Sequence, residues 1–167
     1  MKKPCATVSG AILLVLLGAL CVSGQKDEKN EPAMLVKAAR SLEEKPFDKD
    51  AKNIRAWAIN WVIQTDKVGV KVCSLLVSGL DKKYKYNPEI LGQDTLGMAA
   101  FKLSNPEKAK DEDAAQLAGI ESTLTSYGAM IKEQPKARNA FLDDLVTKRA
   151  DGSLTKYVAE NNCKDKK

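Results

Sequence analysis

Four cysteines constrain what this chain can fold into more than any other feature of its sequence. Cys5 and Cys21 lie in an N-terminal stretch with the composition of an export signal, so its removal leaves Cys73 and Cys163. An even number of cysteines in an exported chain indicates a disulfide. We therefore predict that Cys73 and Cys163 are bonded, which joins the middle of the chain to its end. Two reactive thiols are the alternative, but the pair lacks the Cys-x-x-Cys spacing of a redox site.

The first 24 residues have the three parts of a secretory signal peptide. Lys2 and Lys3 supply positive charge, residues 11–22 form an uninterrupted apolar run, and the small residues Ser23 and Gly24 precede a polar segment. We predict cleavage near Gly24, which sends the mature chain to a periplasm or to the outside of the cell.

Two other fates of this signal are less favoured. The apolar run is shorter than the roughly 20 residues that span a bilayer, which argues against retention as a membrane anchor. Lipid attachment through Cys21 is disfavoured because Leu20 precedes that cysteine, where bacterial lipoproteins have a small residue. We expect no transmembrane span in the mature chain.

The composition excludes several classes of function. The chain has no histidine, which excludes Ser-His-Asp and Cys-His catalysis, His-Glu-x-x-His zinc sites and histidine-ligated haem. Without Lys2 and Lys3, the 27 basic residues become 25 against 22 acidic ones, a net charge of about +3. Because this charge is mild and interleaved with acidic residues, we expect no nucleic-acid partner. We also expect no cofactor, no metal site and no catalytic residue.

Apolar residues recur at three-to-four spacing along most of the mature chain, which indicates amphipathic helices. Prolines and polar turns divide these stretches, and no pair of alternating runs suggests a β-hairpin. We predict an all-α fold, a compact single-domain bundle of five to seven helices with one disulfide. The predicted helices cover residues 33–44, 49–65, 67–80, 87–103, 114–132 and 136–149, with a short last helix from 154.

The stretch 67–80 carries two conflicting patterns. Val68, Val70 and Val72 alternate as in a strand, whereas Cys73 and the leucines and valine after it have helical spacing. We expect a helix here. We also expect Gly92 and Gly97 to allow close approach of a neighbouring backbone in the apolar helix 87–103, because glycines otherwise lower helix propensity.

These boundaries define the organisation of the chain. We expect a signal peptide at 1–24, a flexible linker at 25–31, the helical domain at 32–163 and a charged tail at 164–167. The length of the mature part suits one domain with its own core.

The loop before residue 87 is the candidate partner surface. It gathers Lys82, Lys83, Tyr84, Lys85 and Tyr86. Tyrosine gives rigid contact area at low entropic cost, so this loop suits an acidic protein partner, an anionic lipid or a glycan. A solvated loop whose tyrosines fold onto the helices is the competing interpretation.

Three shorter patterns favour structural roles. Trp57 and Trp61 share a helix face, which fits core packing better than a pair that stacks a ligand or anchors a partner. Ser153-Leu154-Thr155-Lys156 matches the Ser-x-x-Lys motif of penicillin-interacting enzymes, but Ser153 also suits a helix cap. Glu121-Ser122 is similar to the Glu-Ser of lytic transglycosylases, yet the residues that follow do not fit that family.

The general plan resembles two groups of small exported all-α proteins held by one disulfide. These are the periplasmic acid-stress chaperones and the helical immunity proteins that neutralise peptidoglycan-cutting toxins. The resemblance rests on the signal, on Cys73 inside an expected apolar helix with Gly79 six residues later, and on Cys163 after the last helix. It implies a protein-binding module of the cell envelope. The alternatives are a small envelope enzyme that uses carboxylate or lysine chemistry, for example on peptidoglycan, and a small-ligand carrier.

Overall fold

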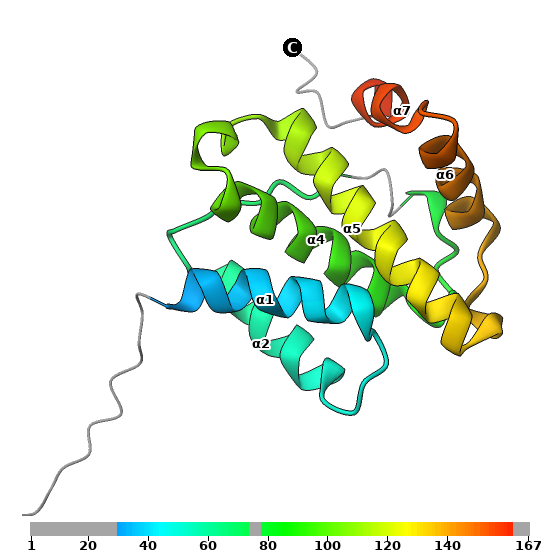
Figure 1. The fold of residues 1–167 in the computed structure, drawn as a ribbon, viewed down its shortest axis with the longest axis horizontal. Coiled ribbons are helices and arrows are strands. Elements are labelled where there is room, and N and C mark those ends of the chain that lie inside the picture. The colour runs from blue at the N-terminus through cyan, green and yellow to red at the C-terminus, as the bar shows by residue number, and fades with distance from the viewer. Residues whose placement is uncertain (1–29, 74–77, 162–167) are drawn as a thin grey trace, which may run out of the picture.

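The computed structural model describes residues 30–73 and 78–161, and this part of the chain is helical without a strand (Figure 1). The predicted signal peptide, Cys163 and the charged tail lie outside the described residues. Six complete α-helices are joined by turns and by two short 3₁₀ segments. Their bounds are α1 Glu31–Glu44, α2 Ala51–Gln64, α4 Asn87–Ser104, η1 Pro106–Lys108, α5 Glu112–Glu133, η2 Pro135–Ala137, α6 Ala140–Ala150 and α7 Leu154–Asn161.

The predicted all-α class is confirmed, and most helix boundaries fall within a few residues of those expected. Proline lies in the first turn of α1 and of α4, where its missing N–H costs no hydrogen bond. Asp111 begins α5 by accepting a hydrogen bond from the backbone N–H of Ala114 at 3.0 Å. Asn139 does the same for α6, with its side-chain oxygen accepting from Phe141 and Leu142. None of the described helices is long and apolar enough to cross a membrane.

The antiparallel pair α4 and α5 forms the centre of the molecule (Figure 1). Helix α4 buries residues on most of its circumference, as its apolar sequence predicts. A Cβ atom at Gly97 would lie 2.5 Å from the Cβ of Ser122 and 3.1 Å from the Cα of Gly119 on α5. The expected role of Gly97 is therefore confirmed. Gly92 instead faces the flexible side chain of Arg55 on α2, whose Cδ would lie 3.0 Å from a Cβ atom added at this glycine.

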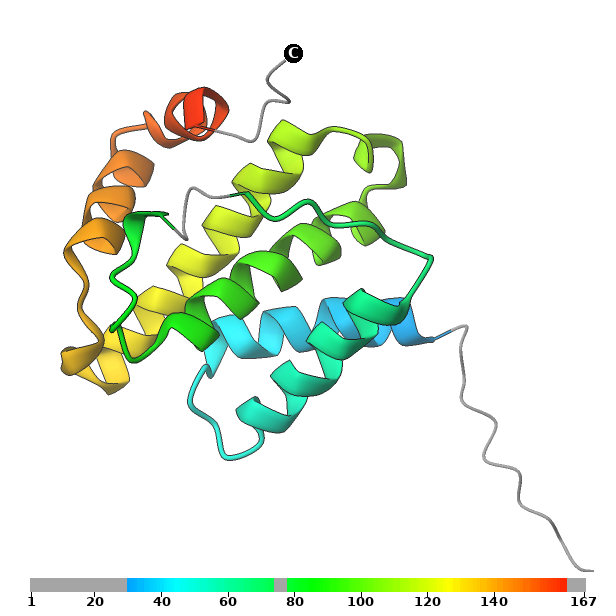
Figure 2. The same ribbon diagram turned by 180° about the vertical axis from the view of Figure 1, so that it is seen from behind.

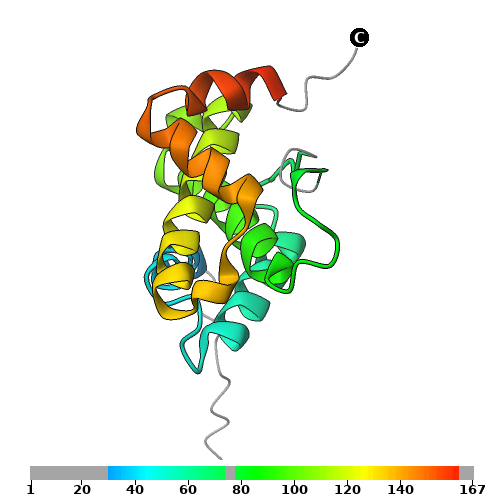
Figure 3. The same ribbon diagram turned by 90° about the vertical axis from the view of Figure 1, so that its right-hand side faces the viewer.

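Two hydrophobic clusters lie on either side of this central pair. Helices α1 and α2 pack with α4 around Leu35, Leu42 and Leu96, at the lower end of the molecule in Figure 3. Helices α6 and α7 pack with α5 around Leu124, Leu142 and Val158, at the upper end. The central pair contributes side chains to both clusters and therefore connects them.

The prediction of a helix over 67–80 is wrong for residues 67–73, which are extended or irregular. In Figure 2 this segment crosses α4 and reaches α5. Lys102 of α4, itself only 6% exposed, donates to the carbonyl of Gly69 at 3.0 Å. The side-chain amide of Gln116 on α5 donates to the carbonyl of Lys71. These tertiary hydrogen bonds satisfy backbone groups that a helix would have paired internally.

Candidate functional site

A groove of about 610 Å³ runs between α1 and α5, with α4 beneath it. Most of its lining surface is apolar, because α1, α4 and α5 contribute alanines together with Val36, Phe101 and Leu117. Gly97 lines the groove and leaves no room for a side chain, since a Cβ atom there would lie 2.5 Å from the Cβ of Ser122. The apolar and small residues that line the groove are Val36, Ala39, Gly97, Ala100, Phe101, Ala114, Leu117 and Ala118.

Polar side chains gather where α1 and α5 converge. Ser122 on α5 donates to Oε1 of Glu43 on α1 at 2.5 Å. The amide of Gln93 on α4 donates to Ser122 Oγ at 2.8 Å and to the carbonyl of Ala39 at 3.0 Å. We call Gln93, Ser122 and Glu43 the apex cluster. It joins α1 to the central helices α4 and α5.

The apex cluster fixes a carboxylate at one end of the groove. Gln93 and Ser122 are buried, whereas Glu43 is half-buried and lines the groove. The hydroxyl of Ser122 already accepts from Gln93 and donates to Glu43, so its role here is to hold Glu43 in place. A fixed carboxylate beside an apolar floor suits a ligand group that carries N–H or O–H donors.

Charged residues surround the groove without giving it one sign. Arg40 and Glu121 line it near the apex cluster, and Lys108 and Asp111 line it near the start of α5. Glu121 forms an ion pair with Arg149 of α6 at 3.7 Å and keeps 43% of its side chain exposed. This exposed, paired glutamate fits the surface role favoured over the transglycosylase pattern.

A buried carboxylate lies near the groove but does not line it. Asp94 of α4 is 3% exposed, and its Oδ1 has no hydrogen-bond partner within the described residues. Burial raises its pKa to about 7. Asp94 faces Gly119 of α5, where a Cβ would lie 2.6 Å from Oδ1. It therefore sits in the helix–helix contact and is not among the residues that line either cavity described here.

The loop predicted as a partner surface divides into two parts. Tyr84 donates to the carbonyl of Ala137 at 2.6 Å, and Tyr86 donates to Oε1 of Gln134 at 2.8 Å. The two tyrosines therefore fold onto the turn after α5, and burial raises the pKa of Tyr84 above its usual range. Lys82, Lys83 and Lys85 remain exposed.

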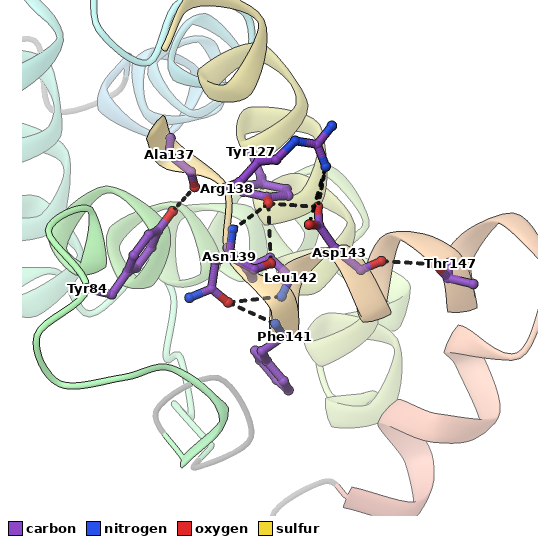
Figure 4. A network of polar contacts seen from close by, with 9 residues as sticks. All are labelled: Tyr84, Tyr127, Ala137, Arg138, Asn139, Phe141, Leu142, Asp143 and Thr147. Carbon is purple, nitrogen blue, oxygen red and sulfur yellow. Dashed lines mark hydrogen bonds and ion pairs between the residues drawn. The ribbon is translucent and has the colours of Figure 1, made fainter. Parts of the chain in front are cut away.

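The same turn carries a polar network that shapes the start of α6 (Figure 4). The hydroxyl of Tyr127 accepts from the backbone N–H of Asn139 at 2.9 Å and donates to Asp143 at 2.8 Å. Burial raises the pKa of Tyr127 to about 12. Asp143 also pairs with the exposed Arg138 at 3.3 Å. Every contact in this network holds the chain in place, so we assign it a structural role.

The remaining sequence patterns fall at separate places. Trp61 is buried at 8% exposure and Trp57 is half-buried, and both pack against the cluster around α1 and α2. Ser153 lies in the turn before α7, and Lys156 forms an ion pair with Glu160 at 3.8 Å. Neither Ser153 nor Lys156 lines the groove.

The sequence did not point to the apex cluster. Gln93 and Glu43 belong to no motif, and they meet Ser122 only through the packing of three helices. Residues 30–73 and 78–161 contain no group of three or more acidic, cysteine or histidine side chains placed to hold a metal ion. Comparisons of the chain with protein families, with curated proteins and with solved structures found no match.

Proposed function

We propose that residues 1–24 direct export and that the mature chain is a protein-binding module of the cell envelope. Its partner inserts an apolar segment into the groove between α1 and α5. The observation that carries this proposal is an apolar groove that ends in a fixed carboxylate.

The chemistry of the groove defines the partner segment. Small and apolar residues of α1, α4 and α5 offer shape and dispersion contacts to aliphatic or aromatic side chains. Glu43, held by Ser122 at 2.5 Å, accepts hydrogen bonds from a donor at one end of that segment. A lysine, an arginine or a free N–H group beside apolar side chains has this chemistry.

The exposed lysines of the loop before α4 extend the proposal. Lys82, Lys83 and Lys85 form no ion pair within the described part of the chain, so they are available to acidic groups of a partner. Exposed charges of this kind mainly affect the rate and salt dependence of association.

Binding is favoured over the enzymatic alternative because Asp94, the carboxylate with the raised pKa, does not line the groove. Groups of strongly perturbed pKa cluster inside the clefts of enzymes. Asp94 has the raised pKa, but the groove is lined by other residues. The groove itself offers a holding carboxylate and an apolar surface, which are elements of recognition.

A blocked groove tests the proposal. Ala118 is half-buried on the groove wall, so Ala118→Trp fills the groove, and Glu43→Gln removes the charge at nearly constant shape. Ala56→Trp, at an exposed position of α2, is the matched control. The mature oxidised protein and its variants are immobilised, and proteins retained from an envelope extract of the source cell are quantified by mass spectrometry.

We expect one partner to be retained by the original protein and by Ala56→Trp, and lost at least ten-fold with Ala118→Trp. Circular dichroism spectra and melting temperatures establish that each variant is folded. Retention by Ala118→Trp at the original level, or enrichment of no protein by the original chain, contradicts the proposal.

A further inference from the structure

We propose that a second cavity, between the start of α1 and the end of α2, binds a neutral saccharide. This cavity has a volume of about 650 Å³ and shares no lining residue with the groove. Two tryptophans line it together with amide and carboxylate side chains. The inference is independent of the proposed protein-binding function.

The two indoles have different environments. Trp61 is mostly buried and donates its indole N–H to Oε2 of Glu31 at 2.7 Å, which fixes both the ring and the carboxylate. Trp57, one turn earlier on α2, is half-buried and its indole N–H has no partner within the described residues. A ring that is fixed by packing but open on the cavity side offers an apolar face and a free donor. That combination stacks against the C–H face of a pyranose ring while bonding one of its hydroxyls.

A row of amides lies beside the indoles. Asn60 and Gln64 are exposed, four residues apart on α2, and both line the cavity. Each amide offers two donor hydrogens and one acceptor oxygen, which matches neighbouring sugar hydroxyls that both donate and accept. Neither side chain is hydrogen-bonded within the described part of the chain.

The charges of the cavity favour a neutral ligand over an anionic one. Two carboxylates, Glu31 and Asp66, line it against one cation, Lys67, which already has an interaction partner. Phosphate and carboxylate ligands need uncompensated cations or clustered N–H donors. A polyhydroxylated neutral ligand instead uses the carboxylates as acceptors. The volume lies within the range of small-ligand sites.

Intrinsic fluorescence tests the inference directly, because the two tryptophans of the chain are both in this cavity. The mature oxidised protein is titrated with N-acetylglucosamine oligomers and with glucose oligomers. Choline chloride and sodium phosphate serve as cationic and anionic probes. We expect a saturable change in tryptophan emission with at least one oligosaccharide series, and none with choline or phosphate.

Variants assign the binding to the cavity by calorimetry. Asn60→Ala/Gln64→Ala removes the exposed amides without touching the core, and Trp57→Ala removes the stacking face. Asn53→Ala, at an exposed position of α2 outside the cavity, is the control. We expect affinity for the oligosaccharide to fall at least ten-fold with the double variant and to be unchanged with the control. The inference is overturned by equal loss in the control, by unchanged binding in the double variant, by no saturable change with any oligosaccharide, or by saturation with choline or phosphate.

Discussion

At the scale of single residues, the least expected group is the carboxyl of Asp94. It is buried between α4 and α5, and its Oδ1 has no partner within the described residues. Burial disfavours the charged form, which is why its pKa is raised to about 7. The neutral acid, in contrast, fits the close contact that Gly119 permits.

This pKa makes stability depend on pH with a definite sign. The native state holds the Asp94 proton more tightly than the unfolded chain, so its stabilising effect is complete below about pH 4. The effect is lost as pH rises through about 7. Above that pH, the free energy of unfolding is lower than at pH 4 by at most about 4 kcal/mol. We expect the free energy of unfolding to fall between about pH 4 and pH 7 in the original protein and to fall less in Asp94→Asn.

Urea unfolding of both proteins across that pH range measures the difference. Asp144→Asn, at an exposed position of α6, is a suitable control for a carboxylate outside the core. The prediction is contradicted if the free energies of unfolding of the original protein and of Asp94→Asn change with pH in parallel.

At the scale of elements, the contact between α4 and α5 depends on the absence of side chains at its centre. Gly97 faces the Cβ of Ser122 and the backbone of Gly119 across the contact. Since backbone atoms cannot move aside as a flexible side chain can, added volume here must separate the helices. The same separation would disturb the apex cluster, because Ser122 is one of its members.

Two glycine substitutions with the same chemistry are expected to have opposite effects. Gly97→Ala adds a methyl group into the contact and should lower the free energy of unfolding by about 1–3 kcal/mol. Gly128→Ala, also within a helix, meets no atom within 4 Å. It should raise stability by about 0.5–1 kcal/mol, because alanine loses less backbone entropy. Chemical denaturation of the two variants checks this, and a stabilising Gly97→Ala would contradict the packing described here.

The segment 67–73 shows how tertiary contacts override a local pattern. Its valines alternate, and the residues after them have helical spacing, so the sequence supports either structure. The outcome is decided by Lys102 and Gln116, which reach the carbonyls of Gly69 and Lys71 from α4 and α5. Lys102 also pairs with Glu112 at 2.6 Å, so its buried charge is compensated.

At the scale of the whole molecule, the predicted disulfide concerns how the last helix is held. Helix α7 has eight residues and buries Leu154 and Val158 against α5 and α6. Cys73, at the end of the segment 67–73, is buried. Cys163 lies outside the described residues, two positions after α7, so the Cys73–Cys163 bond stays a prediction. Such a bond would link the end of α7 to the segment 67–73, which packs on α4 and α5.

The disulfide prediction has a direct chemical and thermodynamic test. The bond would close a loop of about 90 residues and contribute up to about 4.5 kcal/mol through the entropy of the unfolded chain. We expect the oxidised mature protein to contain no thiol that reacts under denaturant. We also expect Cys73→Ala/Cys163→Ala to unfold at lower urea concentration, while reduction of that variant has no further effect. Two titratable thiols in the oxidised protein would overturn the prediction.

The sequence by itself determined most of the elements. Apolar spacing, prolines and caps act within one or two turns, so the all-α class and most helix bounds could be predicted from neighbours in the chain, whereas the extended or irregular backbone of residues 67–73 could not. The same information predicted the lysine–tyrosine loop as a candidate surface. It could not show that Tyr84 and Tyr86 are engaged by residues about 50 positions later, at Ala137 and Gln134.

The tertiary structure decided everything that depends on which helices meet. Glu43 reaches Ser122 across 79 positions of sequence, and Gln93 joins them from a third helix. Glu31 likewise meets Trp61 across 30 positions to form one wall of the second cavity. Side-chain periodicity tells which face of a helix is buried but not which partner covers it. The groove and the tryptophan cavity therefore arise from packing geometry, whereas the helices that form them are encoded locally.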